Sequence, residues 1–352
     1  MATFDYCGDV MRRLTNVLAI GLAVGLAATA AVAGPRIDRV RAQGLVHCGS
    51  FARPGLAIDV AEGEAAAADS VGQTPAPTPW HGLAVEICKA VAVAVLGSPE
   101  KIAFHTYEAA DDFAALSDGE DDIAFLSARE MHMTGMTGRL VPGPAVYIES
   151  IAAMVPTAAG IRRLDDVDAT KGVCFASGSP LEHILPGYFA GRKAAWLPMS
   201  FTEDGEMLDA YNVQRCHVLA GERTTLAMDA LEPGVNQLHS LVLPEAIARF
   251  PIMAATVDDD GQWSALTAWT IYTLLAGDRP ATDWQVGGAA ALPVVLSGSG
   301  LAKDWQAQVL HHVGSYAAIL DRTVGDHSAL KLPTGDNALP EQGGLLAAPM
   351  VE

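Results

Sequence analysis

Three stretches decide the fold: VRAQGLVHCG (residues 40–49), WHGLAVEICKAVAVAVLG (80–97) and KIAFHTYEAADDFAALSDGEDDIAFLS (101–127). Apolar runs typical of strands alternate in them with helical patterns, so strands are expected over 45–48, 101–107 and 122–126, and helices over 85–96 and 111–117. The longer helix has a clear stop signal, since Gly97 follows it and Pro99 stands just beyond. Strands that alternate with helices predict an α/β fold with mainly parallel sheets.

The same alternation continues through the rest of the chain. Strands are expected over 147–155, 172–175 and 216–220, and helices over 180–190, 205–211, 263–275 and 305–320. An extended tail rich in Pro and Gly follows the last helix. The segment 61–79 is irregular and rich in Ala, Gly, Pro, Asp and Glu, which predicts a solvent-exposed, flexible loop insertion.

The first 33 residues have the pattern of an export signal. Arg12 and Arg13 form a positive n-region, Leu14–Ala30 is mostly apolar, and Ala31-Val32-Ala33 supplies the small residues that signal peptidase requires. An uncleaved membrane anchor is the alternative, because the apolar run is just long enough to span a bilayer. No later run reaches about 18 uninterrupted apolar residues. We therefore expect cleavage after Ala33 and a soluble periplasmic protein.

Four cysteines remain once Cys7 leaves with the signal: Cys48, Cys88, Cys174 and Cys216. Four cysteines in an exported protein allow three pairings. We favour nearest neighbours, Cys48 with Cys88 and Cys174 with Cys216, because each pair lies in its own block of strands and helices. Zinc binding by all four is the alternative, but the pairs lack C-x-x-C spacing and export favours oxidation.

Charge and composition argue against several classes of function. The chain has 41 acidic and 22 basic residues, for a net charge of −19, which disfavours binding to nucleic acids or anionic membranes. Aromatic residues make up only 6%, so a broad stacking platform for sugars or bases is not expected. Metalloprotease, nucleophile-elbow, P-loop and dinucleotide-binding motifs are absent from the sequence. We expect no metal and no cofactor.

The order of these motifs resembles the periplasmic amino-acid-binding proteins of ABC transporters, and in particular the subgroup that recognises a broad range of L-amino acids. The similarity continues through GVCFASGSPLEHILPGYFAGR (172–192), YNVQRCHVLAGERTTLA (211–227) and the stretch 304–350. It thus covers nearly all of the mature chain. The four cysteines fall where that subgroup carries two disulfides.

The resemblance implies a two-lobed venus-flytrap of the type II periplasmic-binding-protein fold, with two hinge strands. One lobe would contain residues 36–147 and 251–352, and the other residues 148–250. The hinges would lie near Tyr147-Ile148 and Phe250-Pro251. Closure of the lobes would trap a ligand in the cleft between them.

An α-amino acid in such a cleft needs an arginine for its carboxylate, N–H donors beside it and an acid for its ammonium. The resemblance places Glu222 where the family has an ammonium-binding Asp, although a surface Glu explains it equally well. Gly178 and Ser179 match the N–H site in part. Helix capping alone explains this stretch equally well without a ligand, with Ser179 as N-cap, Pro180 at N1 and Glu182 in a capping box.

The arginine of the family has no counterpart at its usual place, where Thr134 stands. Arg129 or Arg139 in a shifted loop are the candidates to replace it, with an ordinary surface role as the alternative. Phe51 and Leu56 lie near positions where a stacking aromatic is expected, and Phe51 also suits a core. The loop's methionines hint at a more apolar pocket: Met131, Met133 and Met136.

Three functions follow as hypotheses. The first is a solute-binding protein, working as a monomer, that captures an amino acid or related small polar solute and delivers it to an inner-membrane ABC permease. The second is a degenerate binding module that acts as a sensor or accessory protein. The third is a dehydratase-type enzyme on the same fold, for which Glu222 and His132 are the candidate acid–base residues. We expect the first, and expect no enzymatic activity.

Overall fold

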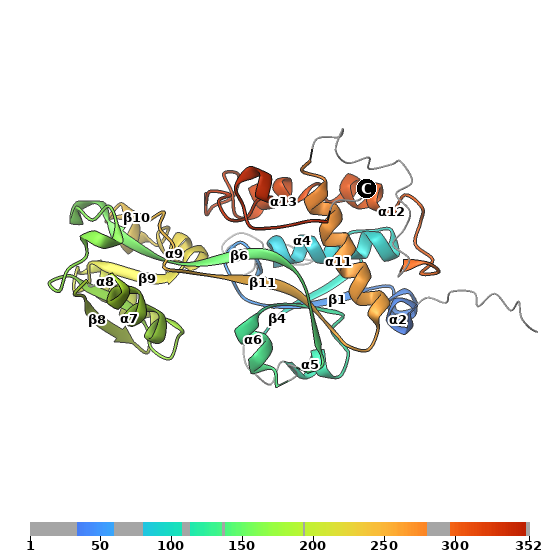
Figure 1. Cartoon of the computed structure of the whole chain (residues 1–352), viewed down its shortest axis with the longest axis horizontal. Helices are drawn as coiled ribbons and strands as arrows, with labels where there is room; N and C mark the ends of the chain where they lie inside the picture. The colour runs from blue at the N-terminus through green and yellow to red at the C-terminus, as the bar shows by residue number, and fades with distance from the viewer. Residues whose placement is uncertain are drawn as a thin grey trace, which may run out of the picture.

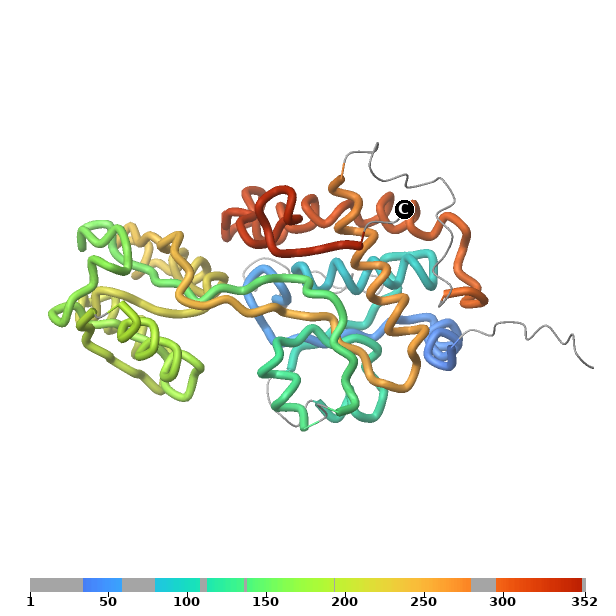
Figure 2. Tube along the Cα trace, in the orientation of Figure 1, coloured from blue at the N-terminus to red at the C-terminus, as the bar shows by residue number. Residues whose placement is uncertain are grey.

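The computed structural model describes residues 34–59, 80–107, 113–135, 138–192, 194–279 and 296–349. The expected signal peptide, the loop 61–79 and Met136 lie outside these ranges. Two lobes are joined by two long strands, β6 (Leu140–Pro156) and β11 (Ala248–Val257), which run from one lobe into the other (Figures 1 and 2). None of the helices in the described ranges has the length and apolar character that crossing a membrane requires.

The first lobe is a sheet covered on both faces by helices. Strand β1 (Val46–Phe51) lies between two parallel neighbours, β4 (Ile102–Tyr107) and β5 (Ile123–Ser127). Most of its helices lie on one face of the sheet: α2 (Pro35–Gln43), α4 (Leu83–Leu96), α11 (Gly261–Ala276), α12 (Trp305–His312) and α13 (Tyr316–Thr323). Two short helices, α5 (Ala114–Ser117) and α6 (Ala128–Met133), lie on the other face (Figure 1).

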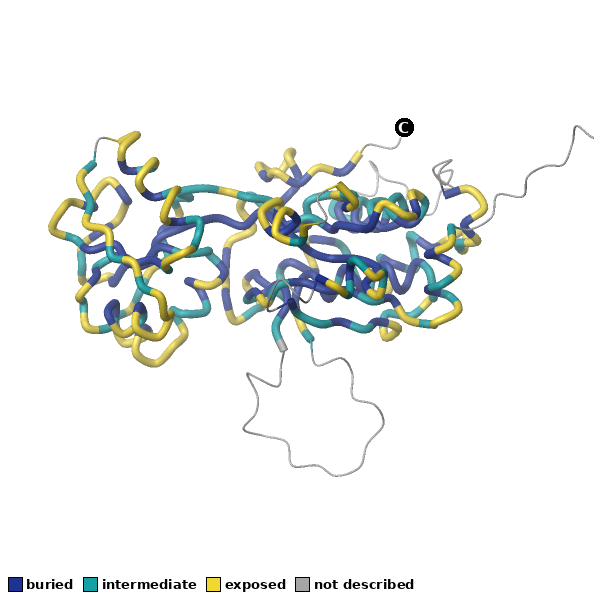
Figure 3. Tube along the Cα trace, turned by 90° about the horizontal axis from the view of Figure 1, so that it is seen from below, coloured by how far each residue is buried: buried dark blue, intermediate teal, exposed yellow. Residues whose placement is uncertain are grey.

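Strand β5 shows why the chain folds this way, since its side chains alternate between the two faces. Ile123 and Phe125 pack with α4 and α11, whereas Ala124 and Leu126 pack with α5 and α6. Both faces of the strand are therefore buried, as in a parallel sheet covered by helices. Figure 3 shows that buried residues, in dark blue, gather in the interior of both lobes.

The second lobe repeats the arrangement with its own core. Its strands are β7 (Gly172–Ala176), β8 (Leu197–Phe201), β9 (Val218–Glu222) and β10 (Ser240–Val242). Its helices are α7 (Leu181–Gly191), α8 (Asp204–Asn212), α9 (Arg223–Asp229) and α10 (Pro233–Asn236). Phe175 faces α7, while Cys174 faces α8, so the strands again bury both faces.

All strands of the described part belong to two sheets. A nine-stranded sheet has the order β4-β1-β5-β11-β6-β9-β7-β8, with β10 paired to β6, and a small sheet joins β2 (Ile58–Asp59) to β3 (Trp80–His81). The pairs inside each lobe's α/β unit are parallel, as predicted from the alternating pattern. The two connecting strands run antiparallel to each other and to their neighbours, so the sheet as a whole is mixed.

The segment expected as one helix over 305–320 is two helices, α12 and α13. Gly314 between them has φ 92°, a left-handed conformation that ends the first helix at little cost for glycine alone. Ser315 then caps the second helix by accepting a hydrogen bond from the backbone N–H of Ala318. The apolar periodicity did not register this turn because it continues across the break.

Both expected disulfides are present. Cys48 on β1 bonds Cys88 on α4, and Cys174 on β7 bonds Cys216 just before β9, so each lobe contains one. All four side chains are fully buried. The four cysteines therefore tie strands to neighbouring segments of the core and do not gather around a zinc ion.

The connecting strands are held in register next to the tail of the chain. Ile148 of β6 lies opposite Pro251 of β11. The side chain of Asn337 accepts a hydrogen bond from the N–H of Ile148 (2.6 Å) and donates one to its carbonyl (3.2 Å). Asn337 in the tail thus provides hydrogen-bond partners for the N–H and carbonyl of Ile148 on β6.

Candidate ligand-binding site

A cleft of about 590 Å³ lies between the two lobes. The first lobe contributes the end of β1, the residue Arg53 just after it, and the start of α6. The second lobe contributes the loop before α7, the end of β9, α9 and the start of α8. Residues 248–250 of β11 form the floor at the junction. A cleft of this kind between lobes is a usual place for a small-molecule site.

Arg53 is the central charged group of the cleft. Its Nη2 pairs with Glu130 of the same lobe, and its Nε donates to Glu222 of the other lobe at 3.2 Å. The residue is only 7% exposed, and its buried Nη1 has no hydrogen-bond partner among the described residues. Burial alone would lower the pKa of Arg53, but the two carboxylates outweigh it and raise that pKa. The guanidinium is therefore permanently charged.

Glu130 is held in place by the start of its own helix. Ser127 caps α6, and the Glu130 carboxylate accepts a hydrogen bond from the Ser127 N–H at 2.7 Å, which completes a capping box. The other carboxylate oxygen faces Arg53. The sequence S-A-R-E at 127–130 carries the signal of this capping box, whereas no local pattern singles out Arg53.

Glu222 lies in the cleft, as its expected role requires. It is the N-cap residue of α9, but its side chain makes no capping bond. The carboxylate instead reaches across to Arg53, and its side chain is 30% exposed.

The predicted N–H site is only partly in the cleft. Ser179 lines it, with its hydroxyl donating to the carbonyl of Ala176 at 2.6 Å. Gly178 lies outside the lining, and its N–H is bonded at 3.0 Å to Glu182. The expected capping box of Ser179 and Glu182 is wrong. Helix α7 begins at Leu181 with Pro180 as N-cap, so Glu182 reaches back to Gly178 instead.

The other predicted residues divide in the same way. Phe51 lines the cleft and packs edge-on against Tyr107 and Phe113, so it serves both the cleft and the core. Arg129 lines the cleft at an exposed position. Thr134 lies at the end of α6, outside the lining, and its hydroxyl donates to the Met131 carbonyl at 2.8 Å.

The remaining candidate residues contribute little to the lining of the cleft. Met133 lines it with 49% of its surface exposed, whereas Met131 belongs to the core. Leu56 is fully buried in the core of the first lobe. Arg139 and His132 are exposed and lie outside the lining.

A buried acid lies on the connecting strand beside this cluster. Glu149 is fully buried, and its carboxylate accepts hydrogen bonds from the Thr224 hydroxyl (2.6 Å) and the Ser150 N–H (2.7 Å). Burial, helped by the negative charge of Glu222, raises the pKa of Glu149 to about 7, although both hydrogen bonds and Arg53 act in the opposite direction. This carboxyl group therefore titrates near neutral pH.

The pKa of Glu149 predicts a pH-dependent stability. Folding raises that pKa from its ordinary 4.5 to about 7, so the protonated Glu149 stabilises the folded protein. This contribution to the free energy of unfolding is complete below pH 4.5 and is lost as pH rises through about 7. The expected loss is up to about 3 kcal/mol of unfolding free energy. Urea unfolding of the wild type and of Glu149→Gln at about pH 5 and about pH 8 should show the wild type weakening relative to the variant. An unchanged difference between the two would contradict this prediction.

The two lobes, the two connecting strands and the cleft between them make up the type II periplasmic-binding-protein fold. No protein-family model matches the chain. A putative amino-acid ABC transporter-binding protein of Escherichia coli K12, YhdW, is 28% identical over 348 residues, which cover 92% of this chain and 94% of the relative. The general L-amino acid-binding periplasmic protein AapJ of Rhizobium johnstonii is 28% identical over 95% of this chain and 97% of its own length.

Among solved structures, an ABC transporter periplasmic binding protein of Brucella ovis, with glutathione bound, matches with a TM-score of 0.70 and 25% identity. The match covers 90% of this chain and 99% of that one. The homologues of the chain are therefore amino-acid-binding proteins of ABC transporters, and the resemblance read from the sequence is confirmed.

Proposed function

We propose that this protein is an extracytoplasmic solute-binding protein that captures an amino acid or related small polar solute and delivers it to an ABC permease. One observation carries the proposal: Arg53, Glu130 and Glu222 meet in the cleft between the lobes. An α-amino acid presents one carboxylate and one ammonium group, and this cluster offers a guanidinium for the first and carboxylates for the second.

Arg53 takes the role of the missing family arginine. Its buried Nη1 has no acceptor in the described ranges of the chain, and an unpaired buried donor destabilises a protein by about 1–3 kcal/mol. A ligand carboxylate that reaches the guanidinium relieves this penalty and forms a forked, charge-assisted pair. Glu222, released from Arg53, then binds the ligand's ammonium. The ligand thus replaces an ion pair that the empty cleft makes within itself.

The two lobes move as units in this proposal, with residues 36–147 and 251–352 in one and 148–250 in the other. Support comes from the separate cores on either side of β6 and β11. The pair between Arg53 and Glu222 joins the lobes, so exchange of that pair for a ligand couples binding to hinge motion.

The dehydratase hypothesis has less support from the geometry. Of its two candidate residues, Glu222 lines the cleft, whereas His132 is exposed and lies outside the lining. The homologues are binding proteins. We propose that the protein is not an enzyme, that it binds no nucleic acid, and that it meets its permease as a monomer in the periplasm.

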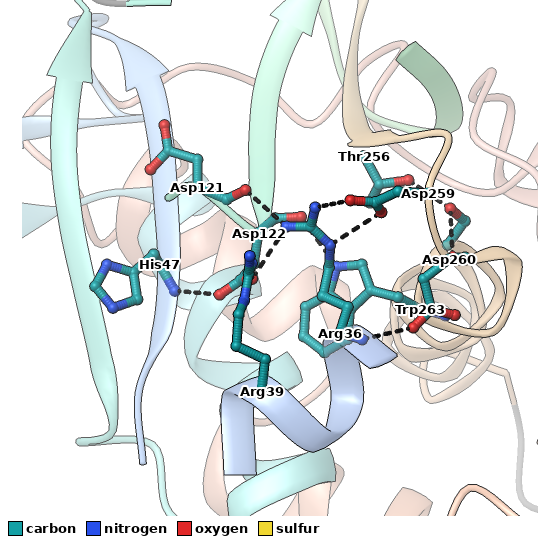
Figure 4. A network of polar contacts seen from close by, with 10 residues as sticks. Arg36, Arg39, His47, Asp121, Asp122, Thr256, Asp259, Asp260 and Trp263 are labelled. Atoms are coloured by element: carbon teal, nitrogen blue, oxygen red, sulfur yellow. Dashed lines mark hydrogen bonds and ion pairs between the residues drawn. The ribbon is translucent and has the colours of Figure 1, made fainter. Parts of the chain in front are cut away.

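We also propose that signal peptidase cleaves after Ala33. The N–H of Gly34 donates to Gln262 at 2.7 Å, and a Cβ at Gly34 would lie 2.2 Å from the Asp260 carboxylate. The next turn is fixed by Arg36, which bonds Asp122 and Asp259 (Figure 4). These contacts support a mature chain that begins at Gly34. N-terminal sequencing of the exported protein should give GPRID, and a different first residue or an intact leader would contradict the site.

Ligand binding is tested by a thermal-shift screen of the mature, oxidised protein against L-amino acids, small carboxylates and amines. A ligand at 100 times its Kd adds about 2.7 kcal/mol of stability, which shifts Tm by several degrees. The protein is first unfolded and refolded so that no ligand is carried over. A shift with α-amino acids is expected. No shift across the panel would refute amino-acid capture and favour the sensor or accessory module.

A further inference from the structure

We propose that the cleft has a second subsite, formed by Asp204 and Asp229, that selects α-amino acids with a cationic side chain. This inference rests on the proposed function and names its substrate class. Asp204 is the first residue of α8 and Asp229 the last of α9, and both line the cleft on the second lobe.

Both acids line the cleft. In the part of the chain that the structure describes, no hydrogen bond or ion pair involves either side chain, and that of Asp204 is exposed. Asp229 is half-buried, and its pKa is raised to about 6 by burial first and then by repulsion from Asp204 and Glu232. A bound cation would offset both the burial and the repulsion.

Arg53 provides an independent reason to expect a ligand in the same cleft. It is 7% exposed, it lines the cleft, and none of the residues that the structure describes provides an acceptor for its Nη1. The cleft thus contains two charged sites, Arg53, which suits a ligand carboxylate, and the pair Asp204 and Asp229, which suits a ligand cation. A ligand that satisfies both carries a carboxylate at one end and a positive group at the other.

Helix α9 sets the separation of the two sites. Glu222, the partner of Arg53, is its N-cap, and Asp229 is its last residue. Seven helical residues rise about 10 Å. A side chain of lysine length, with a hydrogen bond of about 2.9 Å at each end, suits this separation.

Apolar side chains of the second lobe also line the cleft. Ile184 of α7, Met207 and Leu208 of α8, and Leu226 of α9 line it. Methylene groups bury well against such side chains, whereas a short polar side chain would leave them uncovered. The surface therefore favours an aliphatic chain that carries its charge at the tip.

The charges of the lining also favour a cation there. Three arginines line the cleft. Arg53 is paired with two glutamates and Arg249 with Asp336, which leaves Arg129, on the opposite lobe, without an ion pair among the described residues. On the second lobe the unpaired charges of the lining, Asp204 and Asp229, are negative.

The test is calorimetric titration of the mature, oxidised protein with lysine, ornithine and norleucine. Norleucine has the carbon chain of lysine without the terminal amine. Lysine or ornithine is expected to bind about 10- to 100-fold more tightly than norleucine. The double variant Asp204→Asn/Asp229→Asn should lose this preference and keep the wild-type affinity for norleucine. Asp209→Asn, an exposed acid of α8 outside the lining, is the matched control and should bind as the wild type does.

Thermal unfolding without ligand checks the fold of the double variant. Its Tm at neutral pH should match or exceed that of the wild type, because the substitution removes repulsion between the two acids. Equal binding of lysine and norleucine, or equal losses for both in the double variant, would overturn the subsite but leave amino-acid capture standing. Failure of every α-amino acid to bind the wild type would overturn both.

Discussion

Replacing Arg53 with alanine is expected to lower the affinity for the amino-acid ligand by about 30-fold to several thousand-fold. The reason is that a buried carboxylate without its charged partner loses on the order of 2–5 kcal/mol. Arg53 is the one arginine of the cleft lining that is both buried and shared between acids of the two lobes. Titration of the variant with the ligand found in the screen measures the loss.

Two further variants separate charge from geometry. Arg53→Lys keeps a positive charge but loses the fork that matches a carboxylate, so it should fall between the wild type and the alanine variant. Arg129→Ala removes the exposed arginine that also lines the cleft, and it should change the affinity by no more than a few-fold. If Arg129→Ala lost binding and Arg53→Ala kept it, the carboxylate would belong to Arg129.

The importance of Arg53 was not visible in the sequence because its partners are distant along the chain. Glu130 is 77 residues away and Glu222 is 169. The family resemblance places the arginine at the position of Thr134, which lies outside the cleft lining. Arg53 forms its ion pairs only when the fold brings the ends of β1, β5 and β9 together. Local sequence patterns do not show this arrangement.

The strands of the core were predictable for the opposite reason. Runs such as Ile123–Leu126 are apolar throughout because helices cover both faces, and that pattern is local. Strand β8 at the edge of the sheet escaped prediction, since Leu197–Phe201 is largely exposed and contains Pro198. Strand β11 contains Pro251, which argues against a strand in a local pattern, so its expectation as a hinge strand rested on the family resemblance alone.

The cysteine pairing was predictable because each pair stays within one lobe. Cys48 and Cys88 are 40 residues apart and Cys174 and Cys216 are 42 apart, and each pair joins a strand to a segment that packs on it. Cysteines that are neighbours along the sequence are therefore also neighbours in the folded protein. The capping of α7 was not predictable to the residue, because Glu182 has two nearby N–H groups to choose from and takes that of Gly178.

Removing the disulfide of the second lobe is expected to have the largest effect on stability. Cys174 and Cys216 close a loop with a sequence separation of 42, which constrains the unfolded chain by about 4 kcal/mol in the chain-entropy model. The double variant Cys174→Ala/Cys216→Ala should therefore unfold about 10 °C lower than the wild type. Both residues are fully buried, so alanine avoids placing a new polar group in the core.

Reduction provides the control for this comparison. A reductant should lower the Tm of the wild type further than that of the variant, because the variant retains only the disulfide between Cys48 and Cys88. A matched variant, Cys48→Ala/Cys88→Ala, shows whether the first lobe depends equally on its own disulfide. If the Tm of the Cys174→Ala/Cys216→Ala variant equalled that of the oxidised wild type, the second lobe would be held together by its own core and not by the cross-link. Ligand affinity in the same variant should change little, since neither cysteine lines the cleft and Cys174 packs against α8 on its core side.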